Sequence, residues 1–199
     1  MNEKLFVGLT FRSDDNLARK IEGFRKRFDH NYTKASFSHM SLLAPFELHA
    51  KDLESCKEEL KEELDSFFFG QETPLKLSFT GVNFLQTKKN NILYLNPEFS
   101  PDLEHCMDLV RDICTSFIPR NIKYKANPKQ FLPLGSFKQT DPLVEIMDAI
   151  KLEFENNSDL TITGISLFRK KYGIWTTEEN LISFENTKDA FLQYQSTAI

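Results

Sequence analysis

The sequence predicts an α+β protein of two pseudo-symmetric lobes, with antiparallel sheets around a central cleft and helices on the outside. The expected elements follow the order strand, helix, strand, helix, strand in the first half, about residues 1–96, and this order returns in the second half, about 97–199. A chain of 199 residues suits one large domain or two small, closely packed lobes. We therefore expect a single two-lobed domain, whose lobes could exchange strands, with its site in the cleft.

The composition is that of an ordinary globular chain and excludes several classes of protein. Apolar residues make up 40% of the chain, enough for a sizeable core. The formal net charge of -4 argues against a protein that coats DNA or RNA, because such binding needs a broad basic surface. No C-x-x-C spacing occurs among Cys56, Cys106 and Cys114, so we expect reduced, buried thiols. No signal peptide or membrane-length apolar run is visible, which favours a cytoplasmic protein without membrane contact.

The first half divides into elements by its apolar pattern. The expected strands are the segments dense in apolar and β-favouring residues: 5–11, 36–46, 75–85 and 92–95. The expected helices are the segments whose apolar residues recur at helical spacing: 17–28 and 52–68. Gly70 comes just after the second helix, where a glycine commonly ends one.

The second half divides in the same way. The expected helices are 102–117 and 143–154, and Asp141-Pro142 has the chemistry of a cap and first-turn proline for the latter. The expected strands are 131–137 and 160–168, followed by a closing pair of strands, 172–175 and 181–184, across a turn at 176–179.

The strand at 36–46 carries an imidazole and a hydroxyl two residues apart, His39 and Ser41. Alternate residues of a strand point to the same face, so these two side chains project together. An imidazole can move protons near neutral pH, and a hydroxyl can donate a hydrogen bond to a phosphate oxygen. Taken alone, His39 could equally be a hydrogen-bonded core histidine and Ser41 a structural serine.

The segment 39–46, His-Met-Ser-Leu-Leu-Ala-Pro-Phe, resembles the first H-x-T/S motif of the 2H phosphoesterase superfamily. This superfamily includes bacterial 2'-5' RNA ligase-like proteins and cyclic nucleotide phosphodiesterases, and the resemblance covers nearly the whole chain. It implies a 2H phosphoesterase-like fold and phosphodiester chemistry without metal or cofactor. In that chemistry one histidine takes a proton from the attacking oxygen, the other gives a proton to the leaving oxygen, and two hydroxyls hold the phosphate.

The second motif departs from the family pattern, which reads approximately F-x-P-H-h-T-L-G. Aligned on the Leu-Gly pair, Phe131 stands where the second histidine would be and Pro133 where the threonine would be. Neither side chain can move a proton or donate to a phosphate, and proline also lacks the backbone donor. We therefore expect the phosphodiester chemistry to be weakened or lost.

The resemblance implies a monomer that binds a nucleotide or an RNA-terminal phosphate, with His39 and Ser41 as the catalytic pair. Arg12, Phe131, Arg169 and Tyr172 are the candidate substrate-binding residues, and Tyr172 or Lys138 could replace the missing proton donor. The two arginines could equally belong to solvated charge clusters. The alternative function is a non-catalytic nucleotide-binding, RNA-binding or protein-interaction module on the same scaffold, in which Phe131 stacks on a base or fills the cleft.

Overall fold

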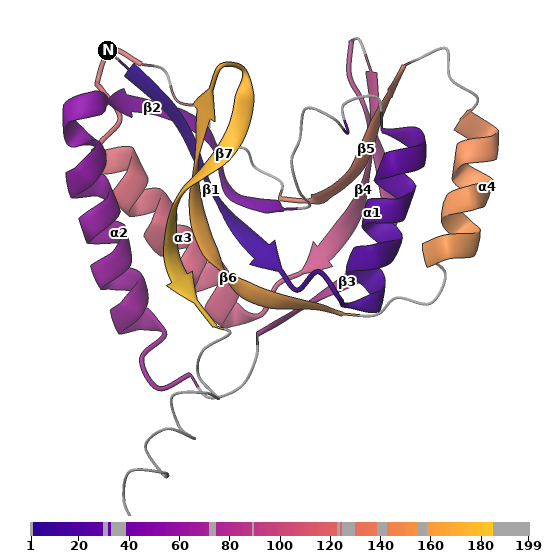
Figure 1. The fold of residues 1–199 in the computed structure, drawn as a ribbon, viewed down its shortest axis with the longest axis horizontal. Coiled ribbons are helices and arrows are strands. Elements are labelled where there is room, and N and C mark those ends of the chain that lie inside the picture. The colour runs from indigo at the N-terminus through magenta and orange to yellow at the C-terminus, as the bar shows by residue number, and fades with distance from the viewer. Residues whose placement is uncertain are drawn as a thin grey trace, which may run out of the picture.

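A seven-stranded antiparallel sheet forms the centre of the protein (Figure 1). The computed structural model describes residues 2–29, 32, 39–71, 75–88, 90–122, 124, 130–138, 143–154 and 159–184. The strands are β1 Asn2–Phe11, β2 Met40–His49, β3 Lys76–Gln86, β4 Asn90–Glu98, β5 Leu132–Lys138, β6 Leu160–Lys171 and β7 Ile174–Ser183. The helices are α1 Asn16–Phe28, α2 Leu53–Phe67, α3 Pro101–Ser116 and α4 Leu143–Phe154.

The sheet divides into two leaves at the start of β6. The strand order is β2-β1-β6-β3-β4-β5. β7 pairs with residues 164–171 of β6. β6 pairs with β1 and β7 along most of its length, but only Leu160 and Thr161 pair with β3. One leaf therefore consists of β2, β1, β6 and β7, and the other of β3, β4 and β5 (Figure 1).

The helices are shared crosswise between these leaves. α2 packs on β7 and α3 on β2, so both cover the first leaf, whereas α1 packs on β5 and α4 on β3 (Figure 1). The ring of Phe24 in α1 lies 6.4 Å from that of Phe137 in β5 and 5.8 Å from that of Phe154 in α4. Each leaf is thus built and covered by elements from both halves of the sequence.

The three cysteines lie in the core, all buried and free. Cys56 belongs to α2, and Cys106 and Cys114 to α3, where both helices turn their buried faces inward. Burial raises the pKa of Cys106 to about 12, so its thiol stays protonated. Within the described ranges, no helix is long and apolar enough to cross a membrane.

The α+β class, with antiparallel sheet and a few helices, is confirmed, but the prediction for the closing strands is wrong. Residues 174–183 form one strand, β7, and the turn lies earlier, at Tyr172 and Gly173. Their φ angles are 53° and 86°, as a two-residue hairpin turn of type I′ requires, and glycine adopts such angles without strain. The polar run 176–180 is part of a strand because, among the residues that the structure describes, β7 pairs with β6 on one side and with no strand on the other. The Asp141-Pro142 cap lies outside the described residues.

Candidate functional site

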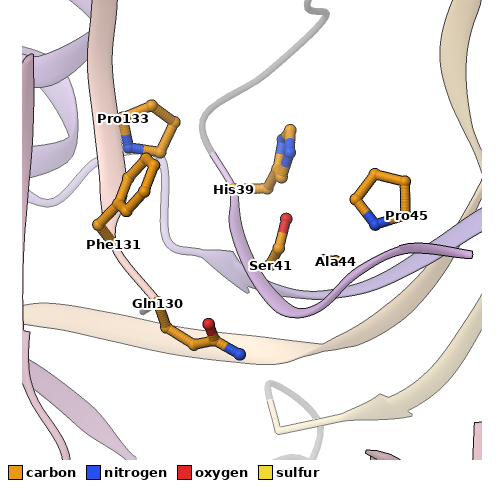
Figure 2. A pocket seen from close by; sticks show the side chains of 7 residues that line it. All are labelled: His39, Ser41, Ala44, Pro45, Gln130, Phe131 and Pro133. Atoms are coloured by element: carbon orange, nitrogen blue, oxygen red, sulfur yellow. The ribbon is translucent and has the colours of Figure 1, made fainter. Parts of the chain in front are cut away.

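A pocket of about 100 Å³ lies where the edge strands of the two leaves meet (Figure 2). The residues that line it come from the start of β2 and the start of β5: His39, Ser41, Ala44, Pro45, Gln130, Phe131 and Pro133. The pocket therefore contains both residues of the first motif and both residues at the aligned positions of the second. The two strands occupy facing positions, as Figure 2 shows for their side chains.

Two hydrogen bonds reach β2 from residues that precede β5 in the sequence. The side-chain amide of Gln130 donates from Nε2 to the carbonyl oxygen of Leu42 at 2.6 Å. The hydroxyl of Tyr124 donates to the carbonyl oxygen of Ala44 at 3.4 Å. Both acceptors belong to β2, which has irregular pairing with β1 in this region, and these bonds satisfy carbonyl groups there.

Aromatic rings hold the imidazole of His39. It stacks on the ring of Phe6, with centroids 4.7 Å apart and an angle of 28°, and lies 5.7 Å from the ring of Phe168. Phe6 in turn stacks on Phe168 at 4.6 Å and meets the edge of Trp175 at 4.8 Å. Phe6 and Phe168 are almost completely buried, so the ring beneath His39 has a fixed position.

The opposite side of the pocket is apolar at the two motif positions. The ring of Phe131 lies 4.6 Å from the ring of Tyr94, and Pro133 pairs with Tyr94 in the β4–β5 ladder. Among the described residues that line the pocket, none is a lysine or an arginine, and His39 is the titratable one. Within the described ranges, no group of three metal-ligating side chains could hold a metal ion.

Two of the expected substrate-binding residues lie elsewhere. Arg12 is exposed just after β1, and its backbone N–H donates to the carbonyl oxygen of Thr161. Tyr172 is fully exposed at the tip of the β6–β7 hairpin. Neither side chain lines the pocket, so the structure brings together His39, Ser41 and Phe131 without them.

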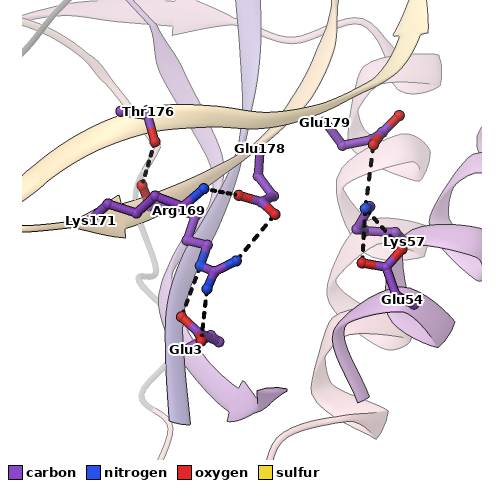
Figure 3. Close-up of polar contacts among 8 residues, drawn as sticks. All are labelled: Glu3, Glu54, Lys57, Arg169, Lys171, Thr176, Glu178 and Glu179. Atoms are coloured by element: carbon purple, nitrogen blue, oxygen red, sulfur yellow. Dashed lines mark hydrogen bonds and ion pairs between the residues drawn. The ribbon is translucent and has the colours of Figure 1, made fainter. Parts of the chain in front are cut away.

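Arg169 contacts two carboxylates and not the pocket (Figure 3). Its Nε and Nη2 both donate to the carboxylate of Glu3 at 2.8 Å, and its Nη1 donates to Glu178 at 3.2 Å. Phe168, the preceding residue, faces His39. Neighbouring residues of a strand point to opposite faces, so the guanidinium lies on the other side of the sheet. Its contacts are those of a structural ion-pair residue.

This ion-pair cluster predicts a pH dependence of stability. Burial alone would raise the pKa of Glu178, but hydrogen bonds and charges from Lys171 and Arg169 lower it below the ordinary value of 4.5. A carboxyl with a lowered folded-state pKa stabilises the protein above its ordinary pKa, and this contribution is lost as the pH falls through the folded value. We expect the free energy of unfolding to decrease as the pH drops below 4.5. The substitution Arg169→Met should make this decrease smaller.

Urea unfolding between about pH 3 and about pH 7 measures the effect. Lys170→Met is the matched control, because Lys170 carries the same charge but lies over the ring of Trp175. Identical pH profiles for Arg169→Met and the wild type would contradict a role for this cluster.

The comparisons with known proteins concern the fold and the family. Residues 13–176 match the family model of the 2'-5' RNA ligase superfamily. The chain belongs to this superfamily. A Staphylococcus haemolyticus protein, which its name assigns provisionally to the phosphoesterases, is 26% identical over 103 residues. That match covers 52% of this chain and 57% of the relative, so it spans little more than half of the relative's length.

Two solved structures show the same fold over most of the chain. Kluyveromyces marxianus Usb1 has a TM-score of 0.52 and 12% identity, covering 87% of this chain and 96% of that one. Escherichia coli LigT, in a complex with NADP+, has a TM-score of 0.50 and 11% identity, covering 89% of this chain and 94% of that one. The predicted membership of the 2H phosphoesterase superfamily and the predicted 2H phosphoesterase-like fold are thereby confirmed.

Sequence reasoning missed three residues that shape the site of this superfamily member. Phe6 and Phe168 fix the imidazole, and Gln130 joins the two motif strands. Phe6 carried a weak signal, because it lies at a strand position among apolar neighbours. Gln130 carried none, because its partner Leu42 is 88 positions away in the sequence.

Proposed function

We propose that this pocket binds the phosphate of a nucleotide or of an RNA end, with His39 and Ser41 as the residues that contact it. The observation that supports this proposal is the pocket itself, in which both motif positions of a 2'-5' RNA ligase superfamily member meet. The solved LigT complex holds NADP+, which is a nucleotide. We also propose that the protein acts as a monomer in the cytoplasm.

The pocket has the reactive side chains of the first motif but not those of the second. The stacked imidazole of His39 could take or give one proton, and the hydroxyl of Ser41 could donate to a phosphate oxygen. The facing positions, Phe131 and Pro133, offer neither a proton nor a hydroxyl. Because a positioned acid or base typically contributes about 10²- to 10⁴-fold, we infer turnover that is slow or lost while phosphate binding persists.

Hydrolysis of 2',3'-cyclic nucleotides tests the role of His39. We expect slow hydrolysis by the wild type and a loss of this residual rate in His39→Ala, because the substitution removes the remaining proton carrier. His49→Ala is the matched control: His49 lies at the far end of β2, is exposed and contacts the side chain of Asn2 at 2.8 Å. Equal rates for His39→Ala and the wild type would remove His39 from any catalytic role.

A second candidate function is a binding module without catalysis. The packing of Phe131 on Tyr94 favours it, because the second motif position holds an aromatic pair where the chemistry needs a proton carrier. A thermal-shift screen with nucleotides and short RNA ends separates the two functions. Binding without turnover supports the module, and the absence of both would indicate a protein-interaction role.

A further inference from the structure

A second pocket, of about 260 Å³, lies on the first leaf near the ends of β1 and β7. Its polar lining consists of hydroxyls and one amide: Thr10, Thr163, Ser166, Asn180 and Ser183. The described residues that line it carry no charge. A pocket of this chemistry suits a neutral group that both donates and accepts hydrogen bonds.

The strand register connects this pocket with the first one. Ser41 of β2 lies opposite Gly8 of β1, Gly8 lies opposite Ser166 of β6, and Ser166 lies opposite Asn180 of β7. Residues opposite each other in antiparallel strands point to the same face. These four residues therefore form one row across the leaf, in which the rings of Phe6 and Phe168 lie over Gly8, 3.1 Å and 3.4 Å from where its Cβ would be.

The row lies on the same face of the sheet as the imidazole of His39. Phe168 is two residues from Ser166 in β6, so both point to one side of the sheet. The ring of Phe168 lies 5.7 Å from the ring of His39. Neighbouring strands are about 4.8 Å apart, which places Ser41 and Ser166 about 10 Å from each other. The two pockets thus lie on one face of the leaf, on either side of the rings of Phe6 and Phe168.

Hydrogen bonds within the second pocket orient its polar groups. The buried hydroxyl of Ser166 donates to Oδ1 of Asn180 at 3.0 Å, which directs the amide oxygen inward and leaves the amide N–H groups as donors for a ligand. The hydroxyl of Thr163 donates to that of Thr10 at 3.1 Å, which in turn donates to the carbonyl oxygen of Gly164. The lone pairs of Thr163 can still accept a bond.

We propose that the second pocket is a subsite for the nucleoside of a ligand whose phosphate lies at His39 and Ser41; this inference rests on the proposed function. A nucleoside is neutral and carries hydroxyl and base-edge groups that both donate and accept hydrogen bonds. A separation of about 10 Å between Ser41 and Ser166 matches the reach of one nucleotide unit. A second phosphate would be disfavoured there, because no cation among the lining residues would balance its charge.

Titration of the full chain with the four common nucleoside 3'-monophosphates, and separately with inorganic phosphate, tests the subsite. We expect Thr163→Val and Asn180→Leu to weaken binding of the nucleotides by about 3- to 10-fold each, the effect of one lost hydrogen bond. Binding of inorganic phosphate should not change in either variant. Ser41→Ala should weaken the binding of both the nucleotides and inorganic phosphate.

Thr176→Val is the matched control, because its hydroxyl donates to the carbonyl oxygen of Arg169 outside the second pocket. NMR of the wild type adds a measurement that does not depend on how a variant folds: the side-chain amide resonances of Asn180 should shift with nucleotide and not with inorganic phosphate.

The outcomes separate the subsite from the proposed function. Nucleotide binding that depends on Ser41 but is unchanged in Thr163→Val and Asn180→Leu would overturn the subsite and leave the phosphate site intact. An Asn180 amide that does not respond to bound nucleotide would overturn it as well. A wild type that binds none of the four nucleotides would overturn both proposals.

Discussion

The double substitution Phe131→His with Pro133→Thr is expected to raise the rate of 2',3'-cyclic nucleotide hydrolysis by about 10²- to 10⁴-fold, the contribution of one positioned acid or base. The reason is geometric: both positions line the same pocket as His39 and Ser41, on the facing strand. The new imidazole would supply the second proton carrier, and the new hydroxyl would supply the second phosphate contact. Initial rates measured under identical conditions for the variant and the wild type give the gain.

Adding His39→Ala to the double variant is the control for this gain. If the new side chains act together with the first motif, the additional substitution should return the rate to that of the wild type or below. Circular dichroism and thermal unfolding establish that each variant is folded. A folded double variant without any gain would contradict the alignment of Phe131 and Pro133 with the second motif.

Phe6→Ala is expected to lower the free energy of unfolding by about 3–5 kcal/mol, because it leaves a cavity in place of a buried aromatic ring. Phe6 is 2% exposed and its ring contacts those of His39, Phe168 and Trp175. The same substitution removes the ring on which the imidazole stacks. The proton resonances of the His39 ring should therefore move as the ring current is lost, in addition to the change in stability.

Phe84→Ala in β3 is the matched control, because the side chain of Phe84 is 56% exposed. Its effect on the free energy of unfolding should stay within about 0.5 kcal/mol, as for most surface substitutions. Urea unfolding gives both values. A loss in Phe6→Ala as small as that of the control, with an unmoved His39 resonance, would show that Phe6 does not hold the imidazole.

Local patterns in the sequence were sufficient to predict most of the helices and strands. Apolar spacing reports which face of a segment is buried, and this determined both ends of α1 closely and the start of β6. The turn at Tyr172 and Gly173 was missed because the polar residues after it suggested a loop. An edge strand with one solvated face has the same composition as a loop, so its pairing partner must be known to tell them apart.

The second-motif alignment placed Phe131 and Pro133 opposite the first motif, and the pocket brings these residues together. The surrounding residues were harder to predict because their partners are distant in the sequence. Arg169 follows the residue beside His39, yet its guanidinium binds Glu3, 166 positions away. A single sequence reports the alternation of a strand but not which of its faces lines the cleft, so Arg169 and Phe168 could not be distinguished.

The crosswise sharing of strands and helices bears on how the chain can fold as it is synthesised. β1 emerges from the ribosome before the other strands of the sheet, but one of its two neighbouring strands, β6, is among the last of these elements to follow. Until then β1 has an open edge, and α1 lacks the β5 surface on which it packs. Contacts between such distant segments slow folding, since a long loop must close before they form. Neither half can therefore complete a leaf on its own, and the nascent chain carries unpaired strand edges, which favour aggregation, until β6 is available.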